Sequence, residues 1–294
     1  MESGNDGLLH SALDVLGLPS AELVSAETRA TDASVWQVRH DGRLLAIRVL
    51  REEQTSVMEI EHRSMDLVRS AGVPAPAIVS TAMIDGRRPT MAIEWMAGES
   101  VGDVLLQKPH LARRLGAQAG NCLAKIHAIP DPVIPGSDNW IARGARNDPA
   151  LVASLTRLSV RAGSLLHLDF HPFNLVAQGG RIVGVLDWTN SSVGDPRADV
   201  ARALTILQVS APLFIAEHGA RRMTLGLFTR AFMQGYQRNA GSVEDLAPFM
   251  VWAGQWMLED LGPILDQLPV ANPLRLRDRI VQKTADWRAL AHLS

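Results

Sequence analysis

The chain has 294 residues, of which 20% are charged and 47% hydrophobic, and its formal net charge is −2. These values are ordinary for a folded protein, and a nearly balanced charge offers no basic field for nucleic acid. No apolar run approaches the roughly 20 residues that cross a bilayer, and the polar N-terminus does not resemble a secretory signal. The single cysteine, Cys122, excludes an intrachain disulfide and suits a reducing compartment. We therefore expect a cytoplasmic protein that binds neither nucleic acid nor a membrane.

The first hundred residues are rich in predicted strands. Alternating apolar and polar residues, broken by turn signals, predict strands at 35–39, 43–50, 77–83 and 89–96. Asp41-Gly42 and Asp85-Gly86 supply the tight turns of two hairpins. A helix is predicted at about 53–70, between the hairpins. Together these elements predict an N-terminal nucleotide-binding lobe, residues 1–97, with an antiparallel sheet and one helix.

Beyond a predicted hinge at 96–100, the pattern becomes helical. Helices are predicted at 101–107, 110–128, 150–161 and repeatedly from 197 to the end. The proline-rich stretch 130–149 is predicted as a loop. Short strands are predicted at 164–168, 174–178 and 181–187. The second lobe, residues 98–294, is thus expected to be mainly helical and to hold the catalytic and acceptor-binding residues.

The most informative stretch is H-L-D-F-H-P-F-N at 167–174, followed by L-D-W at the end of an apolar run. Phosphoryl transfer needs a carboxylate at the acceptor hydroxyl and oxygen ligands for the magnesium ions that bridge the phosphates. Asp169 fits the carboxylate that orients and deprotonates the acceptor. Asn174 and Asp187 fit the two magnesium ligands. The pattern predicts a phosphotransferase and does not name its acceptor.

The histidines of this stretch allow two interpretations. In a catalytic loop, His167 and His171 support the loop by hydrogen bonding, and His171 can also lie near the acceptor. On a strand, His167, Asp169 and His171 would share one face like metal ligands, with Asp187 as a bridging carboxylate of a metallohydrolase. Pro172 favours the loop.

Upstream, L-A-I-R matches the strand pattern V-A-I-K of kinases, with Arg48 in place of lysine. Arg48 is the candidate cation that grips the phosphates, since a guanidinium binds phosphate oxygens in pairs. A carboxylate on the following helix should hold it; Glu61 has the better spacing, and Glu59 is the alternative. The turn that should cover the phosphates, Thr28–Ser34, contains no glycine, so Ser34 or backbone amides are the candidate contacts there.

Taken together, H-L-D-F-H-P-F-N-L-V, G-V-L-D-W and V-G-D-P-R-A-D-V-A resemble the aminoglycoside phosphotransferase family, which includes macrolide, homoserine and choline-type kinases. The likeness continues upstream through E-H-R-S-M-D-L-V-R-S-A-G-V-P-A-P, M-A-I-E-W-M-A-G-E and L-A-K-I-H, and it spans roughly residues 30–205. It implies an α+β fold of the protein-kinase-like, two-lobed kind, with a nucleotide held between the lobes.

The resemblance also assigns residues outside the motif. It implies that Glu94, Trp95 and Met96 meet the nucleotide base through backbone groups. By the same matching, Asp195 and Asp199 would brace the metal loop and the catalytic loop. Without the family, Asp195 would be read as a helix N-cap and Asp199 as a surface acid.

The acceptor side carries fewer signals. Trp252 and Trp256 are four residues apart and share a helical face, with Glu259 and Asp260 one turn further on. This face can wall an acceptor pocket, with acids for a polycation and indole rings for a sugar. The alternative is a pair of core tryptophans beside a solvated acidic helix end.

We expect an enzyme that moves the γ-phosphate of ATP or GTP, with Mg²⁺, to a hydroxyl of a small molecule. Only seven residues separate Asp187 from Asp195, which leaves no room for the activation segment of a protein kinase. An aminoglycoside-type antibiotic is the leading acceptor; a macrolide or another metabolite is the alternative. The family commonly has glycine at the position of Leu168 and lysine at that of Arg48. These departures and the glycine-free turn make a catalytically weak nucleotide-binding protein the second hypothesis. A monomer or a homodimer is expected.

Overall fold

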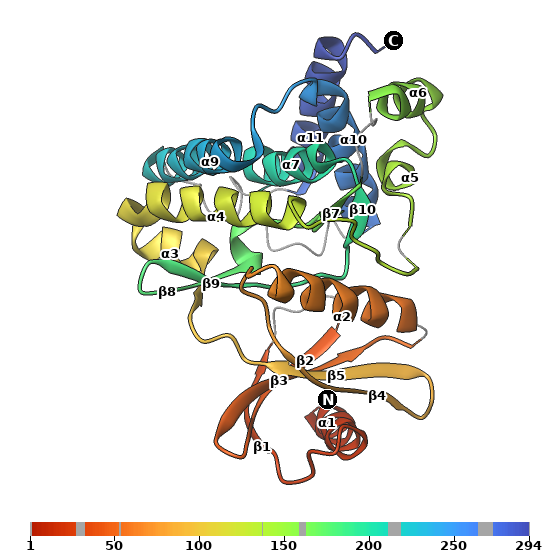
Figure 1. The fold of residues 1–294 in the computed structure, drawn as a ribbon, viewed down its shortest axis with the longest axis vertical. Coiled ribbons are helices and arrows are strands. Elements are labelled where there is room, and N and C mark those ends of the chain that lie inside the picture. The colour runs from red at the N-terminus through yellow and green to blue at the C-terminus, as the bar shows by residue number, and fades with distance from the viewer. Residues whose placement is uncertain are drawn as a thin grey trace.

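The structure is a computed structural model that describes residues 2–27, 33–52, 54–136, 138–158, 163–210, 219–263 and 273–293. Two lobes are stacked along its long axis (Figure 1), which confirms the predicted fold class. The N-terminal lobe contains a five-stranded antiparallel sheet in the order β1-β2-β3-β5-β4. Its strands are β1 (Glu22–Glu27), β2 (Ala33–His40), β3 (Arg43–Leu50), β4 (Ile78–Ile84) and β5 (Arg88–Glu94). The sequence predicted four of these strands and missed β1.

Both predicted hairpins form at their Asp-Gly turns. Asp41 and Gly42 have φ values of 48° and 75°, and Asp85 and Gly86 have 51° and 68°. Two consecutive positive φ values follow the right-handed twist of paired strands, and aspartate and glycine adopt them at low cost. The β2–β3 register then places Arg48 opposite Val35.

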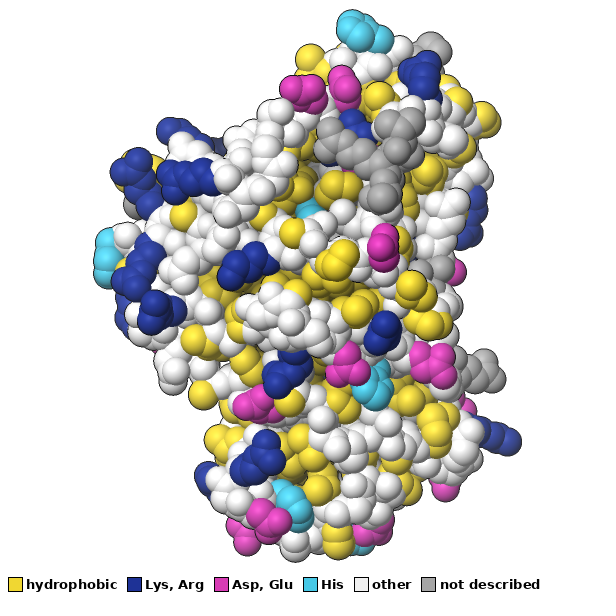
Figure 2. Space-filling view, in the orientation of Figure 1, with side chains coloured by type: hydrophobic (Ala, Val, Ile, Leu, Met, Phe, Trp, Pro, Cys, Tyr) yellow, Lys and Arg dark blue, Asp and Glu magenta, His cyan; other side chains and the backbone are white. Residues whose placement is uncertain are grey.

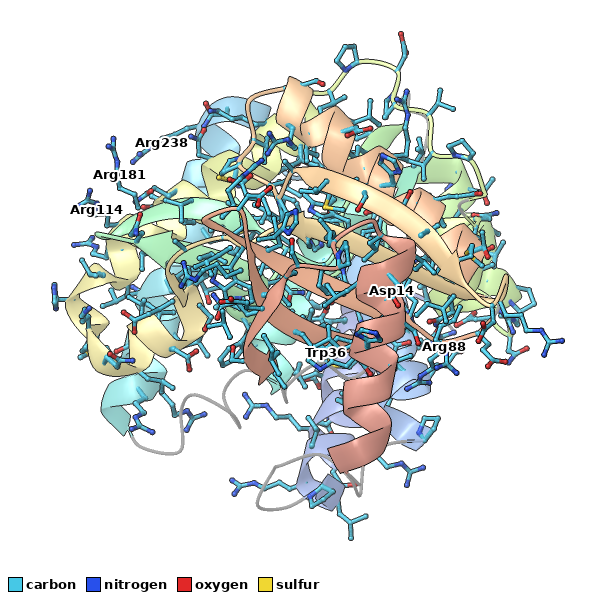
Figure 3. The ribbon with its side chains drawn as sticks, turned by 90° about the horizontal axis from the view of Figure 1, so that it is seen from below. Asp14, Trp36, Arg88, Arg114, Arg181 and Arg238 are labelled. Carbon is cyan, nitrogen blue, oxygen red and sulfur yellow. The ribbon has the colours of Figure 1, made fainter. Side chains whose placement is uncertain are left out.

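A helix packs on each face of this sheet, one more than the sequence predicted. Helix α2 (Thr55–Ser70) lies between the sheet and the C-terminal lobe, and α1 (Glu2–Val15) crosses the outer face beside Trp36 (Figure 3). The apolar stripe of α1, formed by Leu9, Ala12 and Leu13, packs on this face of the sheet together with Leu16, just after the helix. The stripe has helical spacing, so the sequence did carry the signal for α1.

The C-terminal lobe is mainly helical. Its helices are α3 (Val101–Gln107), α4 (Ala112–His127), α5 (Trp140–Ala145), α6 (Pro149–Leu158), α7 (Pro196–Thr205), α9 (Gly219–Ala240), α10 (Leu246–Leu261) and α11 (Pro273–Leu290), with shorter turns at Pro109–Leu111, Pro172–Asn174 and Ile206–Ser210. Two small sheets join β6 (Glu99–Ser100), β8 (Leu175–Gln178) and β9 (Arg181–Val185), and β7 (Ser164–Leu166) with β10 (Ser192–Gly194). None of the helices in the described ranges is long and apolar enough to cross a membrane.

One element departs from the predicted loop at 130–149. Helix α5 forms there, and the side chain of Asn139 caps it by accepting a hydrogen bond from the N–H of Ile141 at 3.0 Å. Asparagine is a strong N-cap, so the helix start was readable from the residue before Trp140. The departure matters because α5 carries Arg143 to the active-site region.

The segment between β5 and β6 has no regular structure and connects the two lobes. Gly98, at its end, has φ 146° and approaches the backbone of Ala177 so closely that a Cβ would collide with it. We keep residue 97 as the proposed end of the N-terminal domain.

On the surface, Lys and Arg side chains gather at the left edge of Figure 2, and Figure 3 labels Arg114, Arg181 and Arg238 on one side of the molecule. Arg114 lies in the first turn of α4, whereas Arg238 on α9 lies two residues after Tyr236, which contacts His127 at the other end of α4.

Candidate active site

The loop after β7 presents Asp169, and Asp199 on α7 holds that loop. The carboxylate of Asp199 accepts hydrogen bonds from the N–H groups of His167 at 2.7 Å and Leu168 at 2.9 Å. Leu168 has φ 63°, in the left-handed region that favours glycine, and its side chain is fully buried. Asp199 thus braces the catalytic loop, and it is buried, so it is not a surface acid.

Asp199 is itself held by a buried histidine that the sequence analysis did not single out as functional. His127, at the end of α4, donates from Nε2 to Asp199 Oδ2 at 3.1 Å, and its Nδ1 lies 2.8 Å from the hydroxyl of Tyr236. An ionised carboxylate only accepts, so this arrangement places the proton on Nε2 and makes Nδ1 the acceptor of the tyrosine proton. The signal was the final residue of L-A-K-I-H, which the family resemblance includes.

The two loop histidines have fixed tautomers. His167 accepts from the N–H of Asp169 at Nδ1 (3.2 Å) and donates from Nε2 to the carbonyl of Leu186 (3.0 Å). His171 accepts from the N–H of Phe173 at Nδ1 (3.2 Å), and its Nε2 faces Asp169 Oδ2 at 3.4 Å. Both nitrogens of His167 are therefore used within the protein. In the described ranges no three His, Cys, Asp or Glu side chains gather as metal ligands.

Asp169 is kept ionised by its neighbours. Burial by itself raises the pKa of Asp169, but electrostatic attraction and a hydrogen bond from His171, together with Arg202 and His167, bring that pKa below its usual value. The amide nitrogen of Asn174 also donates to the carbonyl and to Oδ2 of Asp169, both at 3.0 Å. The carboxylate is thereby oriented on several sides.

The β8–β9 hairpin brings the two candidate magnesium ligands together. Leu186 N–H donates to the carbonyl of Asn174 at 2.8 Å, so Asp187 follows directly beside Asn174. Asp187 has φ 61°, and its Oδ1 accepts from the hydroxyl of Thr189 at 2.7 Å. Since the amide nitrogen of Asn174 is engaged by Asp169, its oxygen is the atom left for a metal. One carboxylate and one amide oxygen suit Mg²⁺, which is bound by few protein oxygens and by phosphates.

Arg48 and Glu61 form an ion pair beside this centre. Glu61 is 1% exposed, and burial raises its pKa; Arg48 acts in the opposite direction, and the nearby carboxylate of Asp187 adds to the rise. Of the two acids that the sequence left open, Glu59 is exposed and Glu61 makes the pair. Glu61 shares the buried face of α2 with Ile60, which explains the choice.

Ser34 is placed differently from the other candidates. It pairs with Val49 across β2 and β3, and Val49 packs on the α1 face of the sheet. Side chains of neighbouring residues alternate between faces, so Ser34 points away from the face of Arg48. The glycine-free turn at 28–32 lies outside the described residues.

The predicted base-contacting segment lies at the end of β5. The N–H groups of Glu94 and Trp95 donate to Ala77 at 2.8 Å and Leu44 at 3.1 Å. The amide of Met96 has no backbone hydrogen bond of this kind within the part of the chain that the structure describes. The Met96 side chain covers Gly184 on β9, three residues before Asp187.

Asp195 is the N-cap of α7, the alternative that the sequence left open for it. Its side chain accepts from the N–H of Arg197 at 3.0 Å and pairs with the Arg197 guanidinium at 2.7 Å, which caps α7. Its hydrogen bonds within the described ranges do not reach the segment at 186–190.

The acceptor side contains a cluster that the sequence only partly predicted. Asp260 accepts from Arg202 at 2.6 Å and from the indole N–H of Trp256 at 2.9 Å. The Arg202 guanidinium lies 4.1 Å from the centre of the Trp256 ring, and its Nε faces the carbonyl of Leu168 at 3.4 Å. Trp252 is fully buried and donates to the carbonyls of Trp140 and Ile141, so it is a core residue. No sequence pattern predicted Arg202 as part of this cluster.

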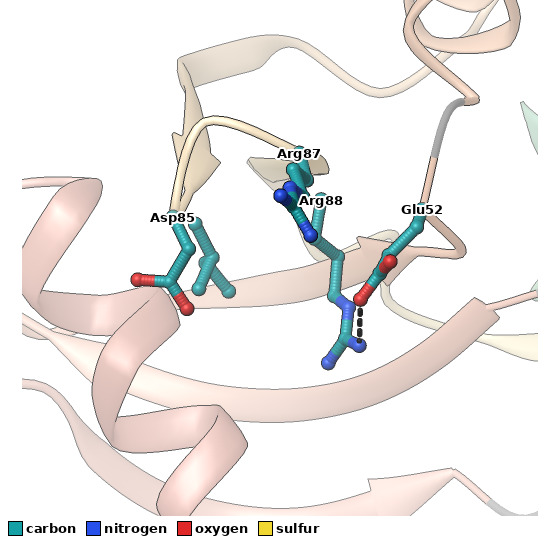
Figure 4. A pocket seen from close by; sticks show the side chains of 5 residues that line it. Glu52, Asp85, Arg87 and Arg88 are labelled. Carbon is teal, nitrogen blue, oxygen red and sulfur yellow. Dashed lines mark hydrogen bonds and ion pairs between the residues drawn. The ribbon is translucent and has the colours of Figure 1, made fainter.

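A separate pocket of about 360 Å³ opens at the outer edge of the N-terminal lobe (Figure 4). It is lined by Glu52, Ile84, Asp85, Arg87 and Arg88, and Arg88 forms an ion pair with Glu52 at 3.0 Å. None of the candidate site residues lines it.

Comparison with known proteins identifies the family. The model described as "Phosphotransferase enzyme family" (APH) matches residues 28–163 and 150–236, which is more than half of the chain. The chain belongs to this phosphotransferase family. It is therefore a small-molecule phosphotransferase.

Solved structures share the fold of this phosphotransferase. A proposed aminoglycoside phosphotransferase (reut_a1007) from Ralstonia eutropha jmp134 superposes with a TM-score of 0.69 at 17% identity, covering 98% of both chains. Aminoglycoside phosphotransferase APH(4)-Ia gives 0.67 at 16% identity, covering 99% of both. Amicoumacin kinase hAmiN, in complex with AMP-PNP, Ca²⁺ and Ami, gives 0.68 at 13% identity, covering 96% of this chain and 93% of its own. The uncharacterized protein YcbJ of Bacillus subtilis (strain 168) is 48% identical over 44 residues, which are 15% of this chain and 14% of YcbJ.

Proposed function

We propose that this phosphotransferase moves the γ-phosphoryl group of ATP or GTP to a hydroxyl of a small molecule, with Asp169 as the catalytic residue and Asn174 and Asp187 as ligands of Mg²⁺. The single observation that carries the proposal is the position of Asn174. Its amide nitrogen binds Asp169 and its backbone carbonyl binds Leu186, so one residue fixes the base next to the metal ligands. Bound Mg²⁺ would neutralise phosphate charge.

The chain's own groups then have defined tasks. Asp169 orients the acceptor hydroxyl and takes its proton as the oxygen bonds to the γ-phosphorus. The bond to the bridging oxygen breaks, and the nucleoside diphosphate leaves with the electron pair. Because its pKa is low, Asp169 is a weak base, and its main contribution is orientation with proton transfer late in the reaction. Arg48, held by Glu61, grips the phosphates.

The nucleotide base is assigned to the segment between the lobes. Glu94, Trp95 and Met96 carry the backbone groups proposed to meet it, and the amide of Met96 is the donor, since those of Glu94 and Trp95 are engaged. For Ser34 we propose a nucleotide contact through its backbone alone, because its side chain faces α1. His167 and His171 position the catalytic loop.

For the acceptor, aminoglycosides are the first class to test. The neighbour APH(4)-Ia has been crystallised with hygromycin B, and hAmiN with Ami. Macrolides and smaller hydroxylated metabolites complete the panel. The second candidate is a catalytically weak nucleotide-binding protein, suggested by Leu168, by Arg48 in place of lysine and by the glycine-free turn. The observed loop weighs against it, because Leu168 adopts the left-handed conformation and its N–H still reaches Asp199.

The test compares Asp169→Asn and Asp187→Asn with Asp14→Asn, an exposed acid on α1, as control. We expect Asp169→Asn to keep nucleotide affinity and to lower the transfer rate by about a thousand-fold. Asp187→Asn should lose the part of nucleotide affinity that depends on Mg²⁺, measured by calorimetry with and without the metal. Transfer is read as a phosphate mass shift of the acceptor. An Asp169→Asn protein as active as the wild type would refute the assignment, whereas nucleotide binding without transfer to any acceptor would favour the second candidate.

A further inference from the structure

Two guanidinium groups lie on one indole ring beside Asp169. Arg202 of α7 is 4.1 Å from the centre of the Trp256 ring, and Arg143 of α5 is 5.3 Å from it. Arg202 reaches the carbonyl of Leu168, the residue before Asp169. Arg143 donates to the carbonyl of Asn190 at 2.6 Å, three residues after Asp187. The two arginines therefore extend from the loop that carries Asp169 to the segment after Asp187.

In its direct contacts this cluster pairs two guanidiniums with one carboxylate. Asp260 is the carboxylate in direct contact, and its two oxygens already accept from Arg202 and from the Trp256 indole. Among the described residues, Arg143 has no carboxylate within 4 Å. The exposed Asp138 and the carboxylate of Asp260 favour its cation from longer range, and Arg202 opposes it. Burial also lowers the pKa of Arg143, and an anion bound there would favour the charged guanidinium.

We propose that Arg143, lying on Trp256, binds an anionic group of the acceptor, such as a carboxylate, sulfate or phosphate, while the acceptor hydroxyl meets Asp169. This inference rests on the proposed phosphoryl transfer and names the chemical class of its acceptor. The guanidinium fork matches the paired oxygens of these anions, and the half-buried position strengthens the contact. A polycationic aminoglycoside would instead meet two arginines and an aspartate that Arg202 already holds.

Inorganic sulfate is the probe, because it tests Arg143 without knowledge of the acceptor. Wild-type protein is titrated with sulfate while tryptophan fluorescence is followed, with the nucleotide site filled by Mg²⁺ and AMP-PNP. We expect saturable binding that weakens at least tenfold in Arg143→Gln and only partly in Arg143→Lys. The matched control is Arg146→Gln, an exposed arginine three residues further along. Equal sulfate binding by wild type and Arg143→Gln would overturn the proposal.

A second arm uses acceptors that differ only in charge, namely D-gluconate against D-glucose and D-glycerate against glycerol, with kanamycin as the cation. The acids should bind at least tenfold more tightly than their neutral partners, and Arg143→Gln should abolish that difference. Kanamycin phosphorylated equally well by wild type and Arg143→Glu would also overturn the proposal. AMP-PNP that fails to bind refutes the proposed function instead; sulfate is then titrated without nucleotide and still decides the role of Arg143.

Discussion

The two sides of Asp169 carry opposite charge. On the nucleotide side, Glu61 and Asp187 lie with the guanidinium of Arg48, so negative charge is in excess. On the acceptor side, the guanidiniums of Arg143 and Arg202 share Trp256 with one carboxylate in contact, so positive charge is in excess. The first side is suited to a divalent cation and the second to an anion.

The two sides also differ in how their groups are held. Asn174 and His167 fix the nucleotide side by hydrogen bonds that join the catalytic loop to the β8–β9 hairpin. The acceptor side depends on α5, α7 and α10 packing against each other. Preorganised hydrogen bonds aimed at the reacting atoms suit a fixed chemical step, whereas helix packing allows the acceptor to vary. Hydrogen bonds thus hold the groups proposed for the chemical step, and helix packing holds those proposed for acceptor specificity.

The largest effect is expected from the buried ion pair of the nucleotide side. Glu61→Ala leaves the nearly buried Arg48 without this carboxylate, so we expect a loss of about 3 kcal/mol in the free energy of unfolding, measured by urea denaturation. Glu59→Ala, on the exposed side of the same helix, should change it by less than about 0.5 kcal/mol. In the double variant Glu61→Ala/Arg48→Ala, the loss in the free energy of unfolding should be smaller than the sum of the two single losses. If it equals that sum, the pair does not act as a unit.

The next effect separates side-chain packing from backbone strain at Leu168, where the two sides meet. Leu168→Ala removes a buried side chain and should cost about 2–4 kcal/mol of unfolding free energy. Leu168→Gly should be about 1 kcal/mol more stable than Leu168→Ala, because glycine adopts φ 63° without strain. The control pair is Leu166→Ala and Leu166→Gly, in strand β7, where glycine should be the less stable by about 0.5–1 kcal/mol. The same order at both positions would show that strain at Leu168 is negligible.

The nucleotide side was predictable from the sequence because its contacts are local. Asp169 and Asn174 are five residues apart, and the Asp-Gly turns fix the hairpin that presents Arg48. The phase of α2 also selects Glu61, since it lies on the buried face. Ser34 shows the limit of such reasoning, because only the strand register reveals that its side chain lies on the other face of the sheet.

The acceptor side could not be predicted in the same way. The Arg202–Asp260 contact spans 58 residues, and the Arg143–Asn190 contact spans 47. No local spacing encodes such distances; they arise when helices pack, which a single sequence specifies only through its whole core. Helix α5 was also missed, although its N-cap Asn139 was visible in the sequence. Without α5, nothing predicted that Arg143 lies near Trp256.

The smallest effect is expected at Asp148, whose hydrogen bonds hold together helices on the acceptor side. Asp148 joins three helices, accepting from Leu151 of α6 at 3.0 Å, Gln255 of α10 at 2.9 Å and Arg288 of α11 at 2.6 Å. The hydrogen bond from Arg288 is the main cause that lowers the pKa of Asp148 from 3.8 to about 2. A carboxyl whose pKa is lower in the folded than in the unfolded protein stabilises the fold above its unfolded pKa, and that stability is lost as the pH falls through the folded pKa.

Asp148→Asn should therefore lower the free energy of unfolding by about 1–2 kcal/mol at neutral pH, after allowance for solvent screening. The difference from wild type should shrink between about pH 4 and pH 2, measured by urea denaturation at a series of pH values. Asp286→Asn, which alters an exposed acid on α11, is the control and should change stability by less than about 0.5 kcal/mol. Because α10 carries Trp256 and Asp260, a loosened Asp148 should also weaken sulfate binding at Arg143 while leaving Mg²⁺-nucleotide affinity unchanged. Equal weakening of both affinities would mean that the two sides of Asp169 are held by one set of contacts, not by two.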